Sequence, residues 1–118
     1  MKLVKQPRGS RVCGQACVAM LADTDLKNGI KLVGHVGGTW GHHLAAALKR
    51  AYVPCADKLV RGEPDGDALL FFKYPSNRRH WVVWYDGKYY DPLEGIFRRV
   101  PKYLRRAQIT SHLPFFLP

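Results

Sequence analysis

The sequence predicts an α+β fold in which N-terminal helices pack on a C-terminal antiparallel sheet. Apolar residues recur at helical spacing in the first part of the chain, and strand-like apolar runs fill the second part. An Asp-Gly pair between two aromatic-rich segments marks a hairpin. Helices that precede the strands, instead of alternating with them, are typical of α+β folds. A length of 118 residues suits one domain, so we expect residues 1–118 to form a single unit.

Three helices are expected in the first half of the chain. The first should be capped by Ser10 and end near Ala22, because apolar side chains recur on one face. The apolar side chains of this face are Cys13, Ala16, Cys17, Met20 and Leu21. A short helix is expected over 26–33 and a loop over 34–38. Thr39 is the expected cap of the third helix. Its apolar stripe consists of Leu44, Ala47, Leu48 and Ala51.

After Tyr52 the pattern changes to that of strands. Residues 53–60 should hold one short strand, and residues 68–73 a buried one. The best hairpin signal is Asp86-Gly87, flanked by strands over 80–85 and 88–91. A short helix over 101–107 and a last strand over 109–117 complete the expected elements.

The chain carries a formal charge of +10. Such a field attracts anions and favours acidic partners, although a solvated basic surface is the simpler interpretation. Hydrophobic residues make up 47% of the chain, which excludes the class of disordered proteins. The basic residues form three groups: Arg8 and Arg11; Arg78 and Arg79; and Arg98, Arg99, Lys102, Arg105 and Arg106.

The three cysteines predict free thiols in a reducing compartment, because a disulfide framework normally uses an even number. The first residues lack the apolar run of a signal peptide. The longest apolar runs, such as residues 69–72, have the length of strands and not of membrane spans. We therefore expect a cytoplasmic protein without a membrane partner, while the oligomeric state stays open.

Cys13 is the first candidate for chemistry. It lies in the expected first turn of a helix, where free backbone N–H groups and the helix dipole stabilise a thiolate. The thiolate is the nucleophilic form of cysteine, so a catalytic cysteine is usefully placed there. As an isolated residue, Cys13 would more often be a small apolar member of the helix stripe than a nucleophile. Cys17 and Cys55 are interpreted in that structural way.

The hairpin connects His80 to Asp91. A two-residue turn at 86–87 places Val82 opposite Asp91, and His80 points to the same face as Val82 because side chains alternate along a strand. Diagonal cross-strand neighbours lie roughly 7–8 Å apart, within reach of two side chains that lean together. An aspartate beside a histidine fixes its tautomer and supports the imidazolium. Taken singly, His80 would be a structural histidine and Asp91 a turn residue before Pro92.

Gln6 lies seven residues before Cys13. Its side-chain amide could donate to a developing oxyanion, together with the backbone N–H of the nucleophile. A polar residue near the N-terminus is uninformative by itself. The interpretation therefore depends on the ordered set of Gln6, Cys13, His80 and Asp91.

Two blocks carry a resemblance to a known family. Gln6 with residues 12–21 (Val-Cys-Gly-Gln-Ala-Cys-Val-Ala-Met-Leu) looks like a Gln…Cys-Gly-x-Ala-x-x-x-Met start, and residues 80–84 with Tyr90-Asp91-Pro92 are similar to a His-aromatic-Val-Val strand and a later Asp-Pro. In this order they resemble papain-like cysteine peptidases related to bacteriocin-processing, double-glycine peptidase domains. Val12 departs from that family, whose processing peptidases often carry an acidic residue there. The Gln-to-Cys spacing is also one residue longer than in many members.

The resemblance implies a papain-like fold and a cysteine peptidase that cleaves a peptide or isopeptide bond without a cofactor. It implies Cys13 as the nucleophile, His80 as the base, Asp91 as the orienting acid and Gln6 as the oxyanion-hole donor. By the same analogy, small residues such as Gly-Gly would precede the scissile bond. Residues at the start of the third helix are expected to line the cleft and bind substrate: Trp40, Gly41, His42 and His43.

Three alternatives remain open. A papain-like fold could act as a deamidase, another acyltransferase or a binder. A nucleic-acid-binding protein would use the basic charge and strand aromatics for stacking, although no recognised binding motif is present. These aromatics are Trp81, Trp84, Tyr89 and Tyr90. A zinc module would lack the usual paired knuckles. Its candidate ligands are Cys13, Cys17, His42, His43, Cys55 and His80.

Overall fold

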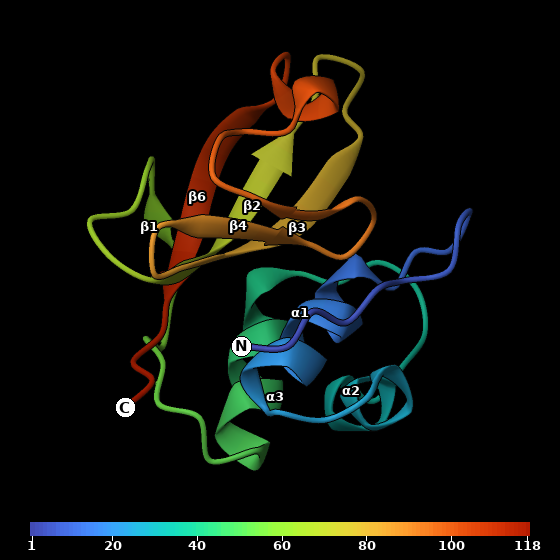
Figure 1. The fold of residues 1–118 in the computed structure, drawn as a ribbon. Helices are drawn as coiled ribbons and strands as arrows, with labels where there is room; N and C mark the ends of the chain where they lie inside the picture. The colour runs from blue at the N-terminus through green and yellow to red at the C-terminus, as the bar shows by residue number, and fades with distance from the viewer.

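Three helices lie together on one face of a six-stranded antiparallel sheet, below the sheet in the view of Figure 1. The computed structural model describes all residues, Met1–Pro118. The helices are α1 (Cys13–Leu21), α2 (Leu26–Val33) and α3 (Gly41–Arg50). The strands, in the sheet order β1-β6-β2-β3-β4-β5, are β1 (Val60–Arg61), β6 (Gln108–Pro114), β2 (Ala68–Lys73), β3 (Arg79–Tyr85), β4 (Lys88–Asp91) and β5 (Gly95–Phe97). The α+β class is confirmed, with the helices first in the chain.

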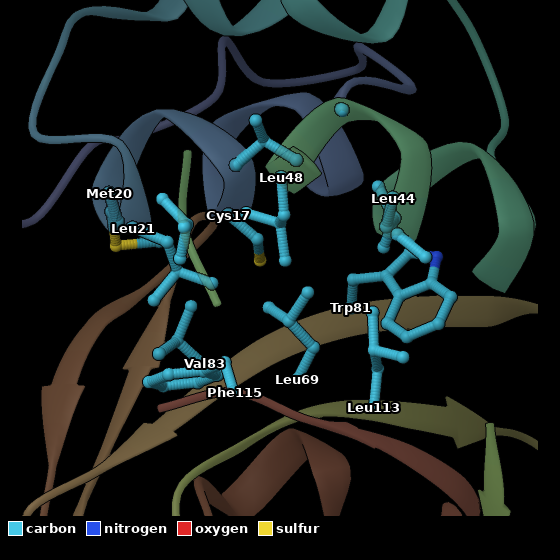
Figure 2. Close-up of a cluster of buried hydrophobic side chains, with 14 of the residues drawn as sticks. Cys17, Met20, Leu21, Leu44, Leu48, Leu69, Trp81, Val83, Leu113 and Phe115 are labelled. Carbon is cyan, nitrogen blue, oxygen red and sulfur yellow. The ribbon is translucent and has the colours of Figure 1, made fainter. Parts of the chain in front are cut away.

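The main core fills the space between the helices and the sheet. Figure 2 shows Cys17, Leu21 and Leu48 from the helices facing Leu69 and Val83 from the strands. Every residue of α1 after Cys13 is buried, and α1 contacts α2, α3 and β3. Packing on all sides therefore holds α1 in place, and only its first residue is partly exposed to solvent.

The opposite face of the sheet has its own smaller core. Leu70 and Phe72 of β2 and Val82 of β3 pack there with Leu104 of the 3₁₀ turn η1 (Lys102–Leu104). Because strand side chains alternate between the two faces, β2 is buried on both sides. His80 shares the face of Val82, so the covering turn η1 also lies on the side of the sheet to which His80 points.

The hairpin has the expected register. Val83 pairs with Tyr90 and Tyr85 with Lys88, so two residues form the turn. Asp86 and Gly87 both have positive φ, at 49° and 75°, as a type I′ turn requires. This turn matches the twist of the flanking strands, and it sets Asp91 of β4 beside the N-terminal half of β3.

Both expected helix caps are wrong. The hydroxyl of Ser10 donates to the Pro7 carbonyl in the preceding turn, and α1 begins after Val12 without a side-chain cap. Helix α3 begins after Trp40, whose backbone N–H donates to Nδ1 of His43 at 2.9 Å, so Thr39 is not the cap. The Ser10 hydroxyl is engaged in the preceding turn and the buried Oγ1 of Thr39 has no hydrogen-bond partner, so neither residue caps a helix.

The expected strand over 53–60 is mostly absent. Only Val60–Arg61 forms β1, and Cys55 makes an isolated bridge to Phe115. The expected helix over 101–107 is reduced to the single turn η1, and the last strand ends at Pro114. Strand β5 was not expected, because three residues beginning with a glycine carry no clear periodic signal. No helix is long and apolar enough to cross a membrane.

Candidate active site

His80 and Asp91 form a buried pair on the hairpin. The His80 Nε2 lies 2.9 Å from the Asp91 Oδ1, and both side chains are nearly or fully buried. The same carboxylate oxygen accepts the backbone N–H of Leu93 at 2.8 Å. These bonds fix the carboxylate and orient the imidazole, which leaves Nδ1 of His80 for a second partner.

That second partner is Cys13. The Cys13 side chain acts on the His80 ring through hydrogen bonding and charge, and both effects raise the pKa of His80. Cys13 is the first residue of α1, and the first backbone N–H that donates within this helix is that of Ala16, to the Val12 carbonyl. The N–H groups of residues 13–15 therefore remain free at the positive end of the helix dipole, where they favour a negative charge.

The surroundings keep His80 protonated at neutral pH. Burial alone would lower the pKa of His80, but hydrogen bonds to Asp91 and Cys13, and the negative charges of both groups, outweigh burial and raise it to about 9. An imidazolium beside a cysteine can give its proton to a leaving group, as a cysteine nucleophile requires of its partner.

The other two thiols differ from Cys13 in their surroundings. Cys17 is fully buried, and burial, together with the charges of Cys13 and Asp91, raises its pKa well above the ordinary value. Burial also raises the pKa of the half-buried Cys55. Neither contacts an imidazole, so both are interpreted as structural thiols.

Gly14 allows a loop to press against the nucleophile's helix. A Cβ on Gly14 would lie 2.1 Å from the Thr39 Oγ1 and 3.1 Å from the Leu44 side chain. The loop is held there by Trp81, whose Nε1 donates to the Thr39 carbonyl at 3.2 Å. Only glycine fits at this position, so the Cys-Gly pair has a packing reason as well as a chemical one.

Gln15 anchors the same loop further along. It is fully buried, and its Nε2 donates to the carbonyls of His35 and Gly37, both at 2.9 Å. The loop before α3 is therefore fastened to the first turn of α1 at two points, Gly14 and Gln15. Trp40 directly follows Thr39, the loop residue that is pressed against Gly14.

Gln6 is brought to the site by its backbone. Its N–H donates to the Pro92 carbonyl at 2.8 Å, which ties the N-terminal segment to the residue after Asp91. The side chain is buried, and its Nε2 donates to the Ser10 carbonyl at 3.1 Å. Gln6 is thus adjacent to the pair, while its amide is engaged by the loop that leads to Cys13.

Three of the four residues that were expected to bind substrate have different environments. Trp40 is 49% exposed, and the Arg79 guanidinium stacks 4.5 Å from its ring centroid. Gly41 is covered by Leu59, which would lie 2.6 Å from an added Cβ, so Gly41 offers no open surface. His42 contacts the His43 ring at 4.1 Å on the exposed start of α3. Of the three, Trp40 fits the expectation best.

Two neighbours of the pair were missed by sequence reasoning. Arg79 directly precedes His80, and its position in a basic pair gave the only signal. Tyr103 of η1 packs edge-on against His80, with ring centroids 6.4 Å apart, and its buried hydroxyl has no hydrogen-bond partner. Only long-range packing of the C-terminal segment brings Tyr103 there, so no local pattern could reveal it.

The structure does not assemble the ligands of the zinc alternative. No three His, Cys, Asp or Glu side chains are placed to hold one metal ion. A pocket of about 470 Å³ lies beside η1, lined by Phe72, Leu104 and Ile109 among others, and does not include Cys13, His80 or Asp91.

No protein-family model matches the chain, and no curated protein sequence matches it. The function of the protein is therefore inferred from the geometry of this site. A thiol, an imidazole and a carboxylate connected in that order can transfer an acyl group through a thioester.

Replacing Asp91 with asparagine should shift the pH dependence more than it lowers turnover. The Leu93 N–H would hold the amide oxygen in the Oδ1 position, so His80 would keep its acceptor but lose a negative charge. We expect activity at pH 7 within about 10-fold of the wild type. In the wild type, kcat/KM should fall near pH 9, where His80 loses its proton. In Asp91→Asn this alkaline fall of kcat/KM should occur at lower pH.

The measurement is kcat/KM against pH for Asp91→Asn, with Asp57→Asn on the surface as the control. The imidazolium is present below the pKa of His80 and lost above it, so a lower pKa means an earlier alkaline loss. An alkaline limb that stays in place in Asp91→Asn would show that this carboxylate does not charge His80.

Proposed function

We propose that this protein is a thiol hydrolase and, more specifically, a papain-like cysteine peptidase that cleaves a peptide or isopeptide bond. The single observation that carries the proposal is the chain of contacts from Cys13 through His80 to Asp91. Each residue comes from a different element: Cys13 from α1, His80 from β3 and Asp91 from β4. The order of these groups matches the needs of a cysteine nucleophile.

The first half of the reaction forms a thioester. The Cys13 sulfur attacks the carbonyl carbon, and the electron pair of the C=O bond moves to oxygen. When the tetrahedral intermediate collapses, the C–N bond breaks and the imidazolium of His80 gives its proton to the leaving amine. Asp91 holds the ring in position throughout, because its Oδ1 is itself fixed by Leu93.

The oxyanion is stabilised at the start of α1. The free backbone N–H of Cys13 points out of the helix end, and Gln6 can supply a second donor when its amide turns from Ser10. A donor of this kind contributes about 3 kcal/mol to transition-state stabilisation.

The second half consumes water. Neutral His80 takes a proton from a water molecule, the resulting hydroxide attacks the thioester carbonyl, and the C–S bond breaks. The carboxylic acid leaves and Cys13 with His80 returns to the starting pair. If an amine takes the place of water, the same site acts as an acyltransferase, and if the leaving group is ammonia it acts as a deamidase.

The nucleic-acid alternative receives less support from the aromatic residues. Trp81 and Tyr90 are buried, so they contribute to the core and not to a stacking surface. Trp84 and Tyr89 contact each other, with ring centroids 4.6 Å apart. Of the four strand aromatics, none is presented singly for a base to stack on.

Digestion of a diverse peptide pool tests the proposal. Mass spectrometry should detect new chain ends with the wild type and none with Cys13→Ala. A peptidase adds one water across a broken chain, whereas a deamidase leaves the chain intact and raises its mass by about one unit. If neither product forms and no thioester to Cys13 can be trapped, the proposal is wrong.

A further inference from the structure

We propose that Arg11 and Arg79 form an anion-binding rim beside Cys13, which selects a peptide with a carboxylate next to the scissile bond. This inference rests on the proposed function and names the substrate class of the same site. The rim consists of the two arginines together with Trp40 and the loop over 37–40 on which they converge.

Arg79 reaches the rim from the sheet. It is the first residue of β3, directly before His80, and its guanidinium lies over the exposed ring of Trp40 at 4.5 Å. Trp40 follows Thr39, which is pressed against Gly14 beside the nucleophile. The stacked pair is therefore linked to the site at both residues, because Arg79 directly precedes His80 and Trp40 directly follows the residue pressed against Gly14.

Arg11 reaches the rim from the other side. It lies two residues before Cys13, and its terminal guanidinium nitrogen lies 3.4 Å from the Cβ position of Gly38. Its side chain thus extends along the loop over 37–40, which continues into Trp40. Two exposed guanidinium groups therefore meet at one loop, one from a residue two positions before Cys13 and one from the residue directly before His80.

Neither arginine has a carboxylate partner. The ion pairs of the protein are Lys49 with Asp57 and His80 with Asp91, so both guanidinium groups are available. A guanidinium stacked flat on an indole keeps the N–H groups at its edge free to bind a carboxylate with two bonds. The Trp40 stack therefore orients Arg79 for an anion without neutralising its charge.

The surrounding charge balance favours the same ligand. The chain has 19 Lys and Arg against nine Asp and Glu, and one of those nine, Asp91, is buried at the site. An extended acidic peptide would gain from both arginines when its scissile carbonyl reaches Cys13. The carboxylate could belong to an Asp or Glu side chain or to the C-terminus of the peptide.

Two alkylating reagents of similar size separate charge selection from reactivity. Iodoacetate carries a carboxylate and iodoacetamide does not, so the ratio of their rates at Cys13 measures anion selection. We expect this ratio to fall about 3- to 10-fold at low salt in the double variant Arg11→Gln/Arg79→Gln. Lys58→Gln/Arg61→Gln removes the same two positive charges at β1, on the far edge of the sheet, and should leave the ratio unchanged.

The outcomes distinguish this inference from the proposed function. Suppose that Cys13 reacts rapidly with both reagents, but the ratio falls no further in Arg11→Gln/Arg79→Gln than in Lys58→Gln/Arg61→Gln. The rim proposal is then wrong, and the assignment of Cys13 as the nucleophile is unaffected. If Cys13 reacts no faster than Cys55 with either reagent, the proposed function fails and the rim fails with it.

Matched peptides then identify the carboxylate. Once a cleaved peptide is known, replacing its acidic residue by the amide, or amidating its C-terminus, should lower kcat/KM for the wild type. The peptide change that lowers kcat/KM identifies the carboxylate that the rim binds. The same peptide change should have little effect on kcat/KM of Arg11→Gln/Arg79→Gln. If neither change alters kcat/KM for the wild type, the rim does not select substrate.

Discussion

Replacing Cys13 with alanine is expected to lower kcat/KM for peptide hydrolysis by on the order of 10⁴-fold or more. The thiol supplies the electron pair for the thioester, and no other group in the site can replace it. Cys17, one helical turn away, is fully buried and cannot reach a substrate. The remaining groups could still bind a peptide, so KM should change less than kcat.

The fold should tolerate Cys13→Ala. Cys13 occupies the partly exposed first position of α1, and alanine suits a helix without leaving a sealed cavity. We expect the free energy of unfolding to change by less than about 1 kcal/mol, measured by urea denaturation. Cys55→Ala is the matched control and should retain turnover. A folded Cys13→Ala protein that hydrolyses peptides at the wild-type rate would contradict the mechanism.

Replacing His80 with glutamine should lower kcat/KM by roughly 10³-fold or more, because no other group can move the proton to the leaving amine. Glutamine is chosen because its amide can still donate to Asp91. Removing the partner altogether would leave a buried charge uncompensated, which costs about 3–5 kcal/mol of stability. The readout is peptide hydrolysis by protein whose fold is checked by circular dichroism.

A second variant tests the same role of His80 if His80→Gln does not fold. His80→Gln/Asp91→Asn removes the buried charge together with the imidazole, so it should fold even if the single variant is unstable. We expect the folded double variant to be as inactive as Cys13→Ala. Wild-type hydrolysis by either folded variant would mean that His80 is not the proton carrier.

The pairing of His80 with Asp91 could be predicted because it is a local property. A two-residue turn and the alternation of side chains fix which residues share a face of a hairpin, whatever surrounds it. The position of Cys13 at the start of α1 followed from helical spacing in the same way. For these residues, short-range geometry was sufficient.

The starts of the helices and the residues that surround the site could not be predicted, because they depend on contacts between residues distant in the chain. Gly41 is covered by Leu59, and Tyr103 reaches His80 only when η1 packs on the sheet. The cap at Ser10 failed because its hydroxyl donates to Pro7 in the preceding turn, and the cap at Thr39 failed because its side chain packs against Gly14 of α1. Arg79 stacks on Trp40 only after β3 and α3 meet.

Alkylation of the three thiols as a function of pH, read by mass spectrometry, tests the pairing of Cys13 with His80 most directly. With neutral iodoacetamide, Cys13 should be modified first at and below neutral pH, while Cys55 and Cys17 lag behind until alkaline pH. His80→Gln should remove this selectivity at low pH. Equal reaction of Cys13 and Cys55 across the pH range, or a selectivity that persists in the His80→Gln protein, would contradict the thiolate–imidazolium pair.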